Sequence, residues 1–310
     1  MNSSPVYASI DIGTNSVLLL VACFDDNQLE VLDELQEIPR LGKGVDSDKN
    51  LHPESCERVI SVLKNYRAYL EQNYPELIDE VIVTATSAVR DSSNRNQFLE
   101  QIFQETGWEV RLLSGDEEAE TTYSGAISVL PYQNKKFVVL DIGGGSTEIA
   151  GGNGLVLNSG ISVDMGSVRF SERYLLNDPP TRDQIEAVRS EAQSLLDKNS
   201  VSLQGFELVG VAGTVTSIAA ILLGLNDYQA EKINGYRLKR SDVQRFINEF
   251  AKITSREIEE KYSPFLKGRG DVITGGLIIL DEFMKLFEFD ELTVSTGGIR
   301  HGILISSLNL

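Results

Sequence analysis

Two glycine loops contain the residues of this chain that are best suited to bind phosphate. The stretch Ala8–Ser16 reads A-S-I-D-I-G-T-N-S, and the stretch Val138–Ser146 reads V-V-L-D-I-G-G-G-S. In both, an apolar run ends in Asp-Ile-Gly and is followed by small residues and a serine. Such a turn exposes backbone N–H groups and hydroxyls, which are the donors that a phosphate needs. The repetition predicts two related domains that close on a phosphorylated ligand from both sides.

Three carboxylates lie in or beside these loops. Asp11 and Asp141 end the two apolar runs, and we expect them to face each other across a cleft. Paired carboxylates beside phosphates usually hold Mg²⁺ through water, and Glu148 could add a third oxygen ligand. Taken alone, Asp11–Ser16 also fits a tight hairpin turn. Its recurrence favours a ligand loop that works with Mg²⁺ or another divalent cation.

A second matched pair of loops follows a short strand in each half. Residues 85–91 read A-T-S-A-V-R-D, residues 212–217 read A-G-T-V-T-S, and each precedes a helical pattern. Hydroxyls and N–H groups at a helix N-terminus bind anions, so Gly213 and Thr214 are candidate phosphate ligands. Simple N-capping by Ser or Thr explains the same residues equally well.

The acidic run that starts at Ser114, S-G-D-E-E-A-E, predicts the beginning of a helix. Ser114 and Glu117 have the spacing of a capping box, and acidic residues in a first turn favour the helix dipole. Capping therefore accounts for the run, and nothing in the spacing singles out Glu118 as a base.

Basic residues beside glycines or motif loops are candidates for local positive charge. They are Arg40, Lys43, Arg90, Arg95, Lys267, Arg269 and Arg300. The pair Gly297-Gly298 fits a ligand contact or a strand-to-helix turn equally well. The apolar helix pattern Val272–Phe287 suits a core helix or a dimer contact, which leaves a homodimer open.

The scaffold that must position these residues is repeated as well. In the first half, the apolar patterns predict strands at Val17–Cys23, Leu29–Ile38 and Glu80–Ala85 and a helix at Pro53–Asn73. In the second half, they predict strands at Thr147–Ala150, Leu155–Val163 and Glu207–Ala212 and a helix at Pro180–Asn199. Both halves therefore share one order, in which three strands precede a helix and a fourth strand.

Composition narrows the class of protein. A chain of 310 residues suits two domains, and the likeliest boundary by composition is Val129–Lys136. The net charge of −18 argues against nucleic acid as a partner but leaves room for a small or linear phosphate substrate. The only histidines, His52 and His301, offer no zinc cluster.

The sequence also bears on location. No apolar run reaches the roughly 20 residues that span a bilayer, so no membrane partner is expected. Residues 1–5 lack the basic region of a signal peptide. The two cysteines, Cys23 and Cys56, fit buried thiols in a reducing compartment. We therefore expect a cytoplasmic protein.

Seven phrases together resemble the exopolyphosphatase/guanosine pentaphosphate phosphatase family. They are D-I-G-T-N-S at Asp11–Ser16, R-L-G-K-G-V at Arg40–Val45, A-T-S-A-V-R at Ala85–Arg90, S-G-D-E-E-A at Ser114–Ala119, D-I-G-G-G-S-T-E at Asp141–Glu148, A-G-T-V-T at Ala212–Thr216 and G-I-R-H-G at Gly298–Gly302. They occur in the family's order from about residue 6 to 308, and the chain looks like the family's short form.

The resemblance implies an α/β, actin-like (ribonuclease H-like) fold, duplicated in two domains with a cleft between them. We expect domains at residues 1–130 and 131–310, with a C-terminal helix at about 299–310 that packs back on the first. The implied reaction is hydrolytic release of the terminal phosphate of inorganic polyphosphate, or of the 5′ γ-phosphate of guanosine pentaphosphate.

The family's pattern also assigns roles to residues of this chain. Glu118 is implied as the base that activates water, Arg90 as a phosphate ligand, and Asp141 and Glu148 as metal ligands. Its two phosphate loops map onto Gly13, Thr14, Asn15 and Ser16, and onto Gly143, Gly144, Gly145 and Ser146.

Two other functions stay open at this point. A kinase or ATPase of the same fold also uses paired Asp-Gly loops, and Gly297-Gly298 could belong to its nucleotide pocket. A non-catalytic sensor of guanosine pentaphosphate, guanosine tetraphosphate or polyphosphate would use the same loops and would tolerate loss of Glu118, which this chain retains. Phosphate release from each candidate substrate would distinguish these alternatives.

Overall fold

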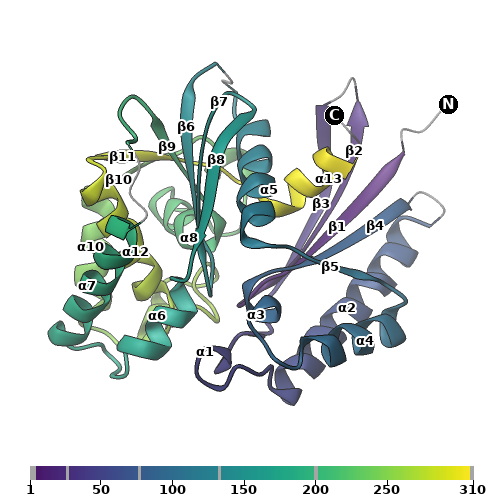
Figure 1. Cartoon of the computed structure of the whole chain (residues 1–310), viewed down its shortest axis with the longest axis horizontal. Coiled ribbons are helices and arrows are strands. Elements are labelled where there is room, and N and C mark those ends of the chain that lie inside the picture. The colour runs from purple at the N-terminus through teal and green to yellow at the C-terminus, as the bar shows by residue number, and fades with distance from the viewer. Residues whose placement is uncertain (1–4, 26–27, 76–77, 132–133, 199–201, 308–310) are drawn as a thin grey trace. The chain divides into compact units, whose positions relative to one another are not determined.

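The repeat in the sequence builds the same order of strands and helices twice in the computed structural model (Figure 1). The structure describes residues 5–25, 28–75, 78–131, 134–198 and 202–307. Four predictions lie partly outside these residues. They concern the N-terminal residues 1–5, the domain boundary Val129–Lys136, the end of the helix Pro180–Asn199, and the end of the C-terminal helix at 299–310. The chain divides into two units, Met1–Gly125 with Ile299–Leu310, and Ala126–Gly298.

The first unit is a five-stranded sheet in the order β3-β2-β1-β4-β5. Its strands are β1 (Val6–Ile12), β2 (Val17–Asp25), β3 (Gln28–Glu37), β4 (Ile78–Ala85) and β5 (Val110–Leu112). Its helices are α1 (Val45–Asp48), α2 (Pro53–Asn73), α3 (Ser87–Arg90), α4 (Arg95–Thr106), most of α5 (Gly115–Ser128) and α13 (Ile299–Ser307). The predicted order of elements is confirmed, and α2 has the predicted bounds.

Alternation along β1 and β2 decides which side chains each face of this sheet buries. Ala8, Ile10 and Leu19 belong to a core shared with α2 and α4, which lie side by side (Figure 1). The opposite face packs against α13, where Leu304 meets Leu20. Ser9 Oγ, on that same face, donates to the carbonyl of Arg300 at 2.9 Å. The C-terminal helix is therefore part of the first unit.

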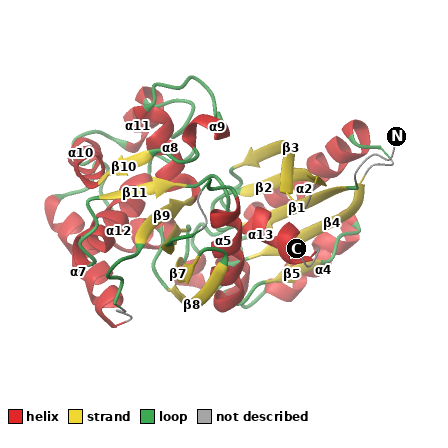
Figure 2. Cartoon of the chain, turned by 90° about the horizontal axis from the view of Figure 1, so that it is seen from above, coloured by secondary structure: helices red, strands yellow, loops and turns green. Residues whose placement is uncertain are grey.

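The second unit contains a six-stranded sheet in the order β10-β11-β9-β6-β7-β8. Figure 2 shows β10, β11 and β9 next to one another in this sheet. Its strands are β6 (Lys136–Ile142), β7 (Thr147–Asn153), β8 (Val156–Val163), β9 (Glu207–Val211), β10 (Arg237–Lys239) and β11 (Glu291–Val294). Its helices are α6 (Ser167–Tyr174), α7 (Arg182–Lys198), α8 (Ala212–Leu222), α9 (Ala230–Ile233), α10 (Arg240–Phe250), α11 (Ser255–Lys261) and α12 (Ile273–Leu286). The order predicted for the second half is also confirmed.

Helix α12 is the core helix of the second unit. Its residues from Ile273 to Met284 are buried, and it packs against α6, α7 and α10. Even its acidic pair is buried: Arg189 of α7 contacts both Asp281 and Glu282, and Arg240 of α10 also donates to Asp281. The helix predicted at Val272–Phe287 thus serves the core, and it gives no support to a homodimer.

Strand pairing explains why the motif loops of each unit meet at one sheet edge. β1 runs parallel to β4 with Ile12 opposite Ala85, and β6 runs parallel to β9 with Asp141 opposite Val211. The carboxyl ends of parallel strands lie at the same edge, so each glycine loop has the second loop of its own unit as a neighbour. In the part of the chain that the structure describes, no helix has the length and apolar character needed to cross a membrane.

Candidate functional site

The first glycine loop is closed on itself and braced from one side. The N–H of Gly13 donates to the carbonyl of Ser16 at 2.9 Å. The carbonyls of Thr14 and Asn15 accept from the N–H groups of Gly42 at 2.7 Å and Arg40 at 2.9 Å. The motif R-L-G-K-G-V therefore positions this loop through its backbone.

Side chains of the first loop are buried and polar, as a ligand loop requires. Thr14 and Asn15 are 7% and 8% exposed. The Oδ1 atom of Asn15 accepts no hydrogen bond within the described residues, so it is ready to accept one from a ligand or from bound water. The hydroxyls of Thr14 and Ser87 lie 2.9 Å apart and join the loop to α3. Thr86, which precedes α3, makes no capping hydrogen bond, so the capping interpretation fails there.

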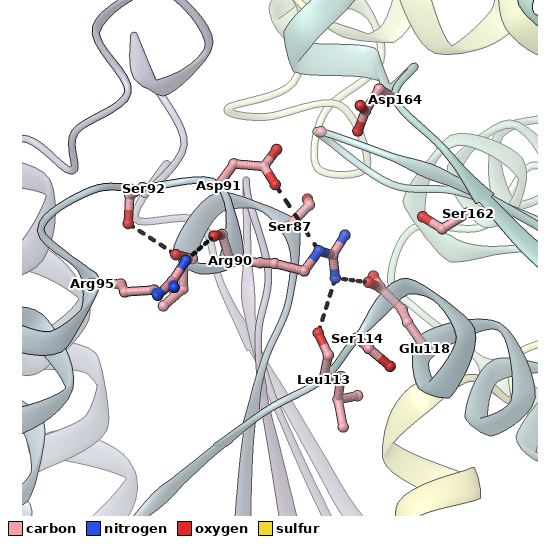
Figure 3. Close-up of polar contacts among 12 residues, drawn as sticks. Ser87, Arg90, Asp91, Ser92, Arg95, Leu113, Ser114, Glu118, Ser162 and Asp164 are labelled. Atoms are coloured by element: carbon pink, nitrogen blue, oxygen red, sulfur yellow. Dashed lines mark hydrogen bonds and ion pairs between the residues drawn. The ribbon is translucent and has the colours of Figure 1, made fainter.

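An ion pair between Arg90 and Glu118 lies beside this loop pair (Figure 3). Nη1 of Arg90 donates to Oε2 of Glu118 at 2.7 Å and to the carbonyl of Leu113 at 3.1 Å. Glu118 is 4% exposed, and the Arg90 side chain is 23% exposed. The carboxylate is therefore removed from bulk water, and the arginine stabilises its charged form.

The neighbouring Glu117 does the capping that the sequence predicts. The backbone N–H and the hydroxyl of Ser114 both donate to Glu117 Oε2 at 2.9 Å, and the N–H of Glu117 donates back to Ser114 Oγ. The hydrogen bond from the Ser114 N–H, with those from Arg111 and the Ser114 hydroxyl, lowers the pKa of Glu117 to about 2. Two adjacent glutamates thus have separate tasks, and Glu118 is not needed for capping.

The second glycine loop repeats the closure of the first. The N–H of Gly143 donates to the carbonyl of Ser146 at 3.0 Å. Gly143 and Gly144 are half-buried, whereas Gly145 and Ser146 are buried. A Cβ atom on Gly143 would come within 3.0 Å of the Ser146 carbonyl oxygen, which explains the need for glycine at the closure.

Two of the three predicted metal ligands are neighbours. Asp141 and Glu148 lie directly opposite each other on β6 and β7, at 7% and 2% exposure. Opposite residues of an antiparallel pair present their side chains on one face, and two buried carboxylates there suit a divalent cation. Ser162 Oγ orients Glu148 by donating to Oε1 at 2.6 Å.

The third predicted metal ligand, Asp11, belongs to the first unit. Across residues 5–25, 28–75, 78–131, 134–198 and 202–307, no group of three or more His, Cys, Asp or Glu side chains is placed to hold a metal ion. The structure therefore brings together Asp141 and Glu148, and the contribution of Asp11 stays a prediction.

The start of α8 has an arginine lying against it. A Cβ atom on Gly213 would lie 1.6 Å from Nη1 of Arg269, so the guanidinium occupies the space that a side chain would fill. Burial lowers the pKa of Arg269 to about 10. Among the described residues, no hydrogen bond or ion pair engages this guanidinium, although it is partly exposed. An anion at Gly213 and Thr214 would supply the missing partner.

The other basic candidates have structural tasks or lie at the surface. Arg300 pairs with Glu34 at 3.0 Å and donates to the carbonyl of Leu19 at 2.9 Å, so it ties α13 to the first sheet. Arg95 donates to the carbonyl of Arg90 at 2.8 Å. Lys43 and Lys267 are exposed. The turn Gly297-Gly298 is braced by a hydrogen bond from the Gly297 N–H to Ser295 Oγ at 3.1 Å.

Sequence reasoning missed Ser87 and Ser162 as members of the site. Ser87 is inside a motif that was recognised, and its position after β4 was the available signal. Ser162 has no motif around it, and only the pairing of β7 with β8, which puts it opposite Glu148, reveals it.

Comparison with known proteins places the chain among phosphatases. A sequence model of the Ppx/GppA phosphatase family matches residues 20–310. Exopolyphosphatase 2 of Mycobacterium tuberculosis is 34% identical over 96% of this chain and 97% of that protein. A guanosine-5'-triphosphate,3'-diphosphate pyrophosphatase of Vibrio atlanticus is 31% identical over 97% of this chain. A bifunctional 3-dehydroquinate synthase/phosphatase of Fusobacterium nucleatum is 35% identical over 97% of this chain.

The chain spans only part of two of these relatives, 46% of the Fusobacterium enzyme and 59% of the Vibrio enzyme. Among solved structures, the Ppx/GppA family member from Aquifex aeolicus superposes with a TM-score of 0.82 at 30% identity. That match covers 99% of this chain and 98% of the Aquifex chain. The fold, with the same order of elements in both units, is therefore that of the Ppx/GppA family.

Proposed function

Because the chain belongs to the Ppx/GppA phosphatase family, we propose that it hydrolyses the terminal phosphoanhydride of inorganic polyphosphate or of guanosine pentaphosphate. Both substrates appear in the names of relatives that match over almost all of this chain. The observation that carries the proposal is the buried Glu118 carboxylate, which Arg90 holds beside the Thr14–Ser87 loop pair while Glu117 does the capping.

In this reaction the protein mainly positions the phosphate and stabilises its charge, since a phosphoanhydride has a good leaving group. The loop N–H groups and Arg90 bind the terminal phosphate in our proposal. Glu118 orients a water molecule in line with the scissile bond and takes its proton. In the proposal, Gly213, Thr214 and Arg269 also bind phosphate.

The buried pair Asp141 and Glu148 would hold the divalent cation, which we propose to be Mg²⁺. When bound, such a cation offsets the negative charge of phosphoryl oxygens. Ser162 keeps Glu148 in place for this role through its 2.6 Å hydrogen bond. We also propose a cytoplasmic location, which is supported by the two buried cysteines, Cys23 and Cys56, because neither is in a disulfide bond.

The test is phosphate release by the purified full chain from polyphosphate, guanosine pentaphosphate and ATP, each with Mg²⁺ and with EDTA. We expect release from at least one of the first two substrates, loss with EDTA, and recovery when Mg²⁺ is restored. Full activity without metal would contradict the proposal that Asp141 and Glu148 hold a cation needed for the reaction. Binding without release would favour a sensor, and preferential use of ATP would favour a kinase or ATPase.

A further inference from the structure

Helix α6 holds the second glycine loop by its carbonyl groups. The carbonyl of Gly143 accepts from the N–H of Ser167 at 2.9 Å. The carbonyl of Gly144 accepts from the N–H groups of Val168 and Arg169, at 2.9 and 3.0 Å. Close approach is possible because Gly166 has no side chain: a Cβ atom there would lie 2.4 Å from the Gly144 carbonyl oxygen.

The third carbonyl, that of Gly145, is held by a side chain. Nε of Arg169 donates to it at 2.6 Å, and Arg169 is 7% exposed. Its contact with the exposed Asp164 is much longer, at 3.9 Å. Backbone N–H groups at the start of α6 donate to the carbonyls of Gly143 and Gly144. The Arg169 side chain donates in the same way to the next carbonyl, that of Gly145.

These contacts fix the direction of the loop N–H groups. In a trans peptide the C=O and the following N–H point to opposite sides. When the carbonyls of Gly143, Gly144 and Gly145 point to α6, the N–H groups of the same three peptides point away from it. Successive N–H groups directed to one side form a concave anion site.

We propose that Arg169 is a positioning residue for substrate, because its Nε–H fixes the last of these three peptides. The inference rests on the proposed function, since it takes phosphate as the ligand of the loop. It differs from the bracing of the first loop, where the backbone N–H groups of Arg40 and Gly42 hold the carbonyls of Asn15 and Thr14. Loss of the Arg169 donor would free the N–H of Ser146 to turn.

Two substitutions separate the hydrogen bond from the charge. In Arg169→Gln the amide nitrogen lies the same number of bonds from Cα as Nε, so the donor stays while the charge is lost. In Arg169→Met both are lost at similar length. Arg173→Met is the matched control, because Arg173 is an exposed residue of α6 one turn further on.

The first readout is independent of catalysis. Amide hydrogen exchange of a peptide covering Asp141–Glu148 is measured in the full-length variants, together with thermal stability. We expect faster exchange in Arg169→Met than in Arg173→Met, and exchange close to wild type in Arg169→Gln. The proposal would be overturned if the loop exchanged equally fast in Arg169→Met and Arg173→Met. It would also be overturned if exchange were equally accelerated in Arg169→Met and Arg169→Gln.

The second readout is steady-state phosphate release. We expect Arg169→Met to raise KM on the order of 10-fold with a smaller change in kcat, as for other residues that orient a ligand-binding group. Arg169→Gln should recover most of this loss. Faster loop exchange with an unchanged KM would overturn the link to substrate. If the wild-type protein releases no phosphate from any substrate, the proposed function fails, while hydrogen exchange still decides whether Arg169 positions the loop.

Discussion

Arg90 and Arg269 each lie beside the second candidate phosphate loop of their own unit, and these two arginines differ in what they contact. Arg90 of the first unit forms a 2.7 Å ion pair with the buried Glu118. Arg269 of the second unit lies against Gly213, and the described residues give its guanidinium no acidic partner. Burial without a partner lowers the pKa of Arg269 to about 10.

Under the proposed function, this difference gives the two arginines different tasks. A carboxylate fixed by an arginine has a defined position and charge, which suits a group that must accept a proton from water. A desolvated arginine without a counter-charge is destabilising until an anion arrives, so part of the substrate's binding energy is realised there. We therefore expect variants of Glu118 and Arg90 to lower kcat and variants of Arg269 to raise KM.

The largest effect should come from Glu118→Gln. Glutamine has nearly the same shape and can still accept a hydrogen bond from Arg90, but it cannot take a proton from water. Loss of a general base typically costs about 10²–10⁴-fold in rate. We expect kcat for phosphate release to fall by that range while binding of substrate, measured by calorimetry, persists.

Glu117→Gln is the internal control for this prediction. Gln also serves in a capping box, so the start of α5 should keep its geometry. Equal loss of activity in both variants would point to a disturbed local structure. Loss of activity in Glu117→Gln alone would show that Glu117, and not Glu118, is the base. Activity in both would break the proposed hydrolase mechanism.

The next largest effect separates the two arginines directly. A charge-assisted hydrogen bond to phosphate is worth about 1.5–3 kcal/mol, or roughly 10–100-fold. Arg269→Ala should raise KM by this factor and leave kcat nearly unchanged. Arg90→Ala should raise KM and also lower kcat, because Glu118 loses the group that fixes it. Identical changes in KM and kcat for the two variants would contradict the different roles proposed for Arg90 and Arg269.

A smaller and more specific effect is expected from Gly213→Ala. The new methyl group would lie 1.6 Å from Nη1 of Arg269, and the flexible side chain would have to move away. We expect KM to rise on the order of 10-fold, as for loss of a hydrogen bond to a charged group. Adding Arg269→Ala should change KM little further. Gly151→Ala is the control, since its Cβ would only contact Phe206 at 3.5 Å.

The fold could be predicted wherever local pattern and long-range packing agree. Helix α2 has its predicted bounds because Pro53 starts it and one apolar face runs through to Leu70. Strand β10 has only three residues, and it exists because β11 pairs with it across a long connection. No local pattern carries that information.

The site shows the same limit at the level of single residues. Glu117 and Glu118 are adjacent acidic residues in the first turn of α5, and both fit the capping pattern. Adjacent positions differ by about 100° around a helix axis, so one points to Ser114 and the other to Arg90. The sequence cannot supply that direction, because it depends on where β4 and β5 place Arg90 and Leu113. The family resemblance predicted the role of Glu118, and that role awaits the kinetic test.

The smallest effect on activity, and a test of how the units differ in stability, concerns His301 in α13 of the first unit. The imidazole is 3% exposed, and its Nδ1 has no partner within the described residues. Burial, with a smaller contribution from the charge of Arg300, lowers the pKa of His301 from 6.5 to about 3. Between these two values the unfolded chain binds a proton that the folded chain does not. The free energy of unfolding should therefore fall as pH falls from 6.5 to 3, by about 1.4 kcal/mol per pH unit from this residue, and be fully retained above 6.5.

His301→Leu should remove this pH dependence and leave phosphate release at pH 7 nearly unchanged. His52→Gln, at a largely exposed histidine, should keep the pH dependence. Denaturant unfolding at pH 7, 6, 5 and 4 measures the slope, and hydrogen exchange shows where opening begins. We expect the strands that pack against α13 to lose protection before those of the second unit. An unaltered slope in His301→Leu would contradict the assignment of this pH dependence to His301.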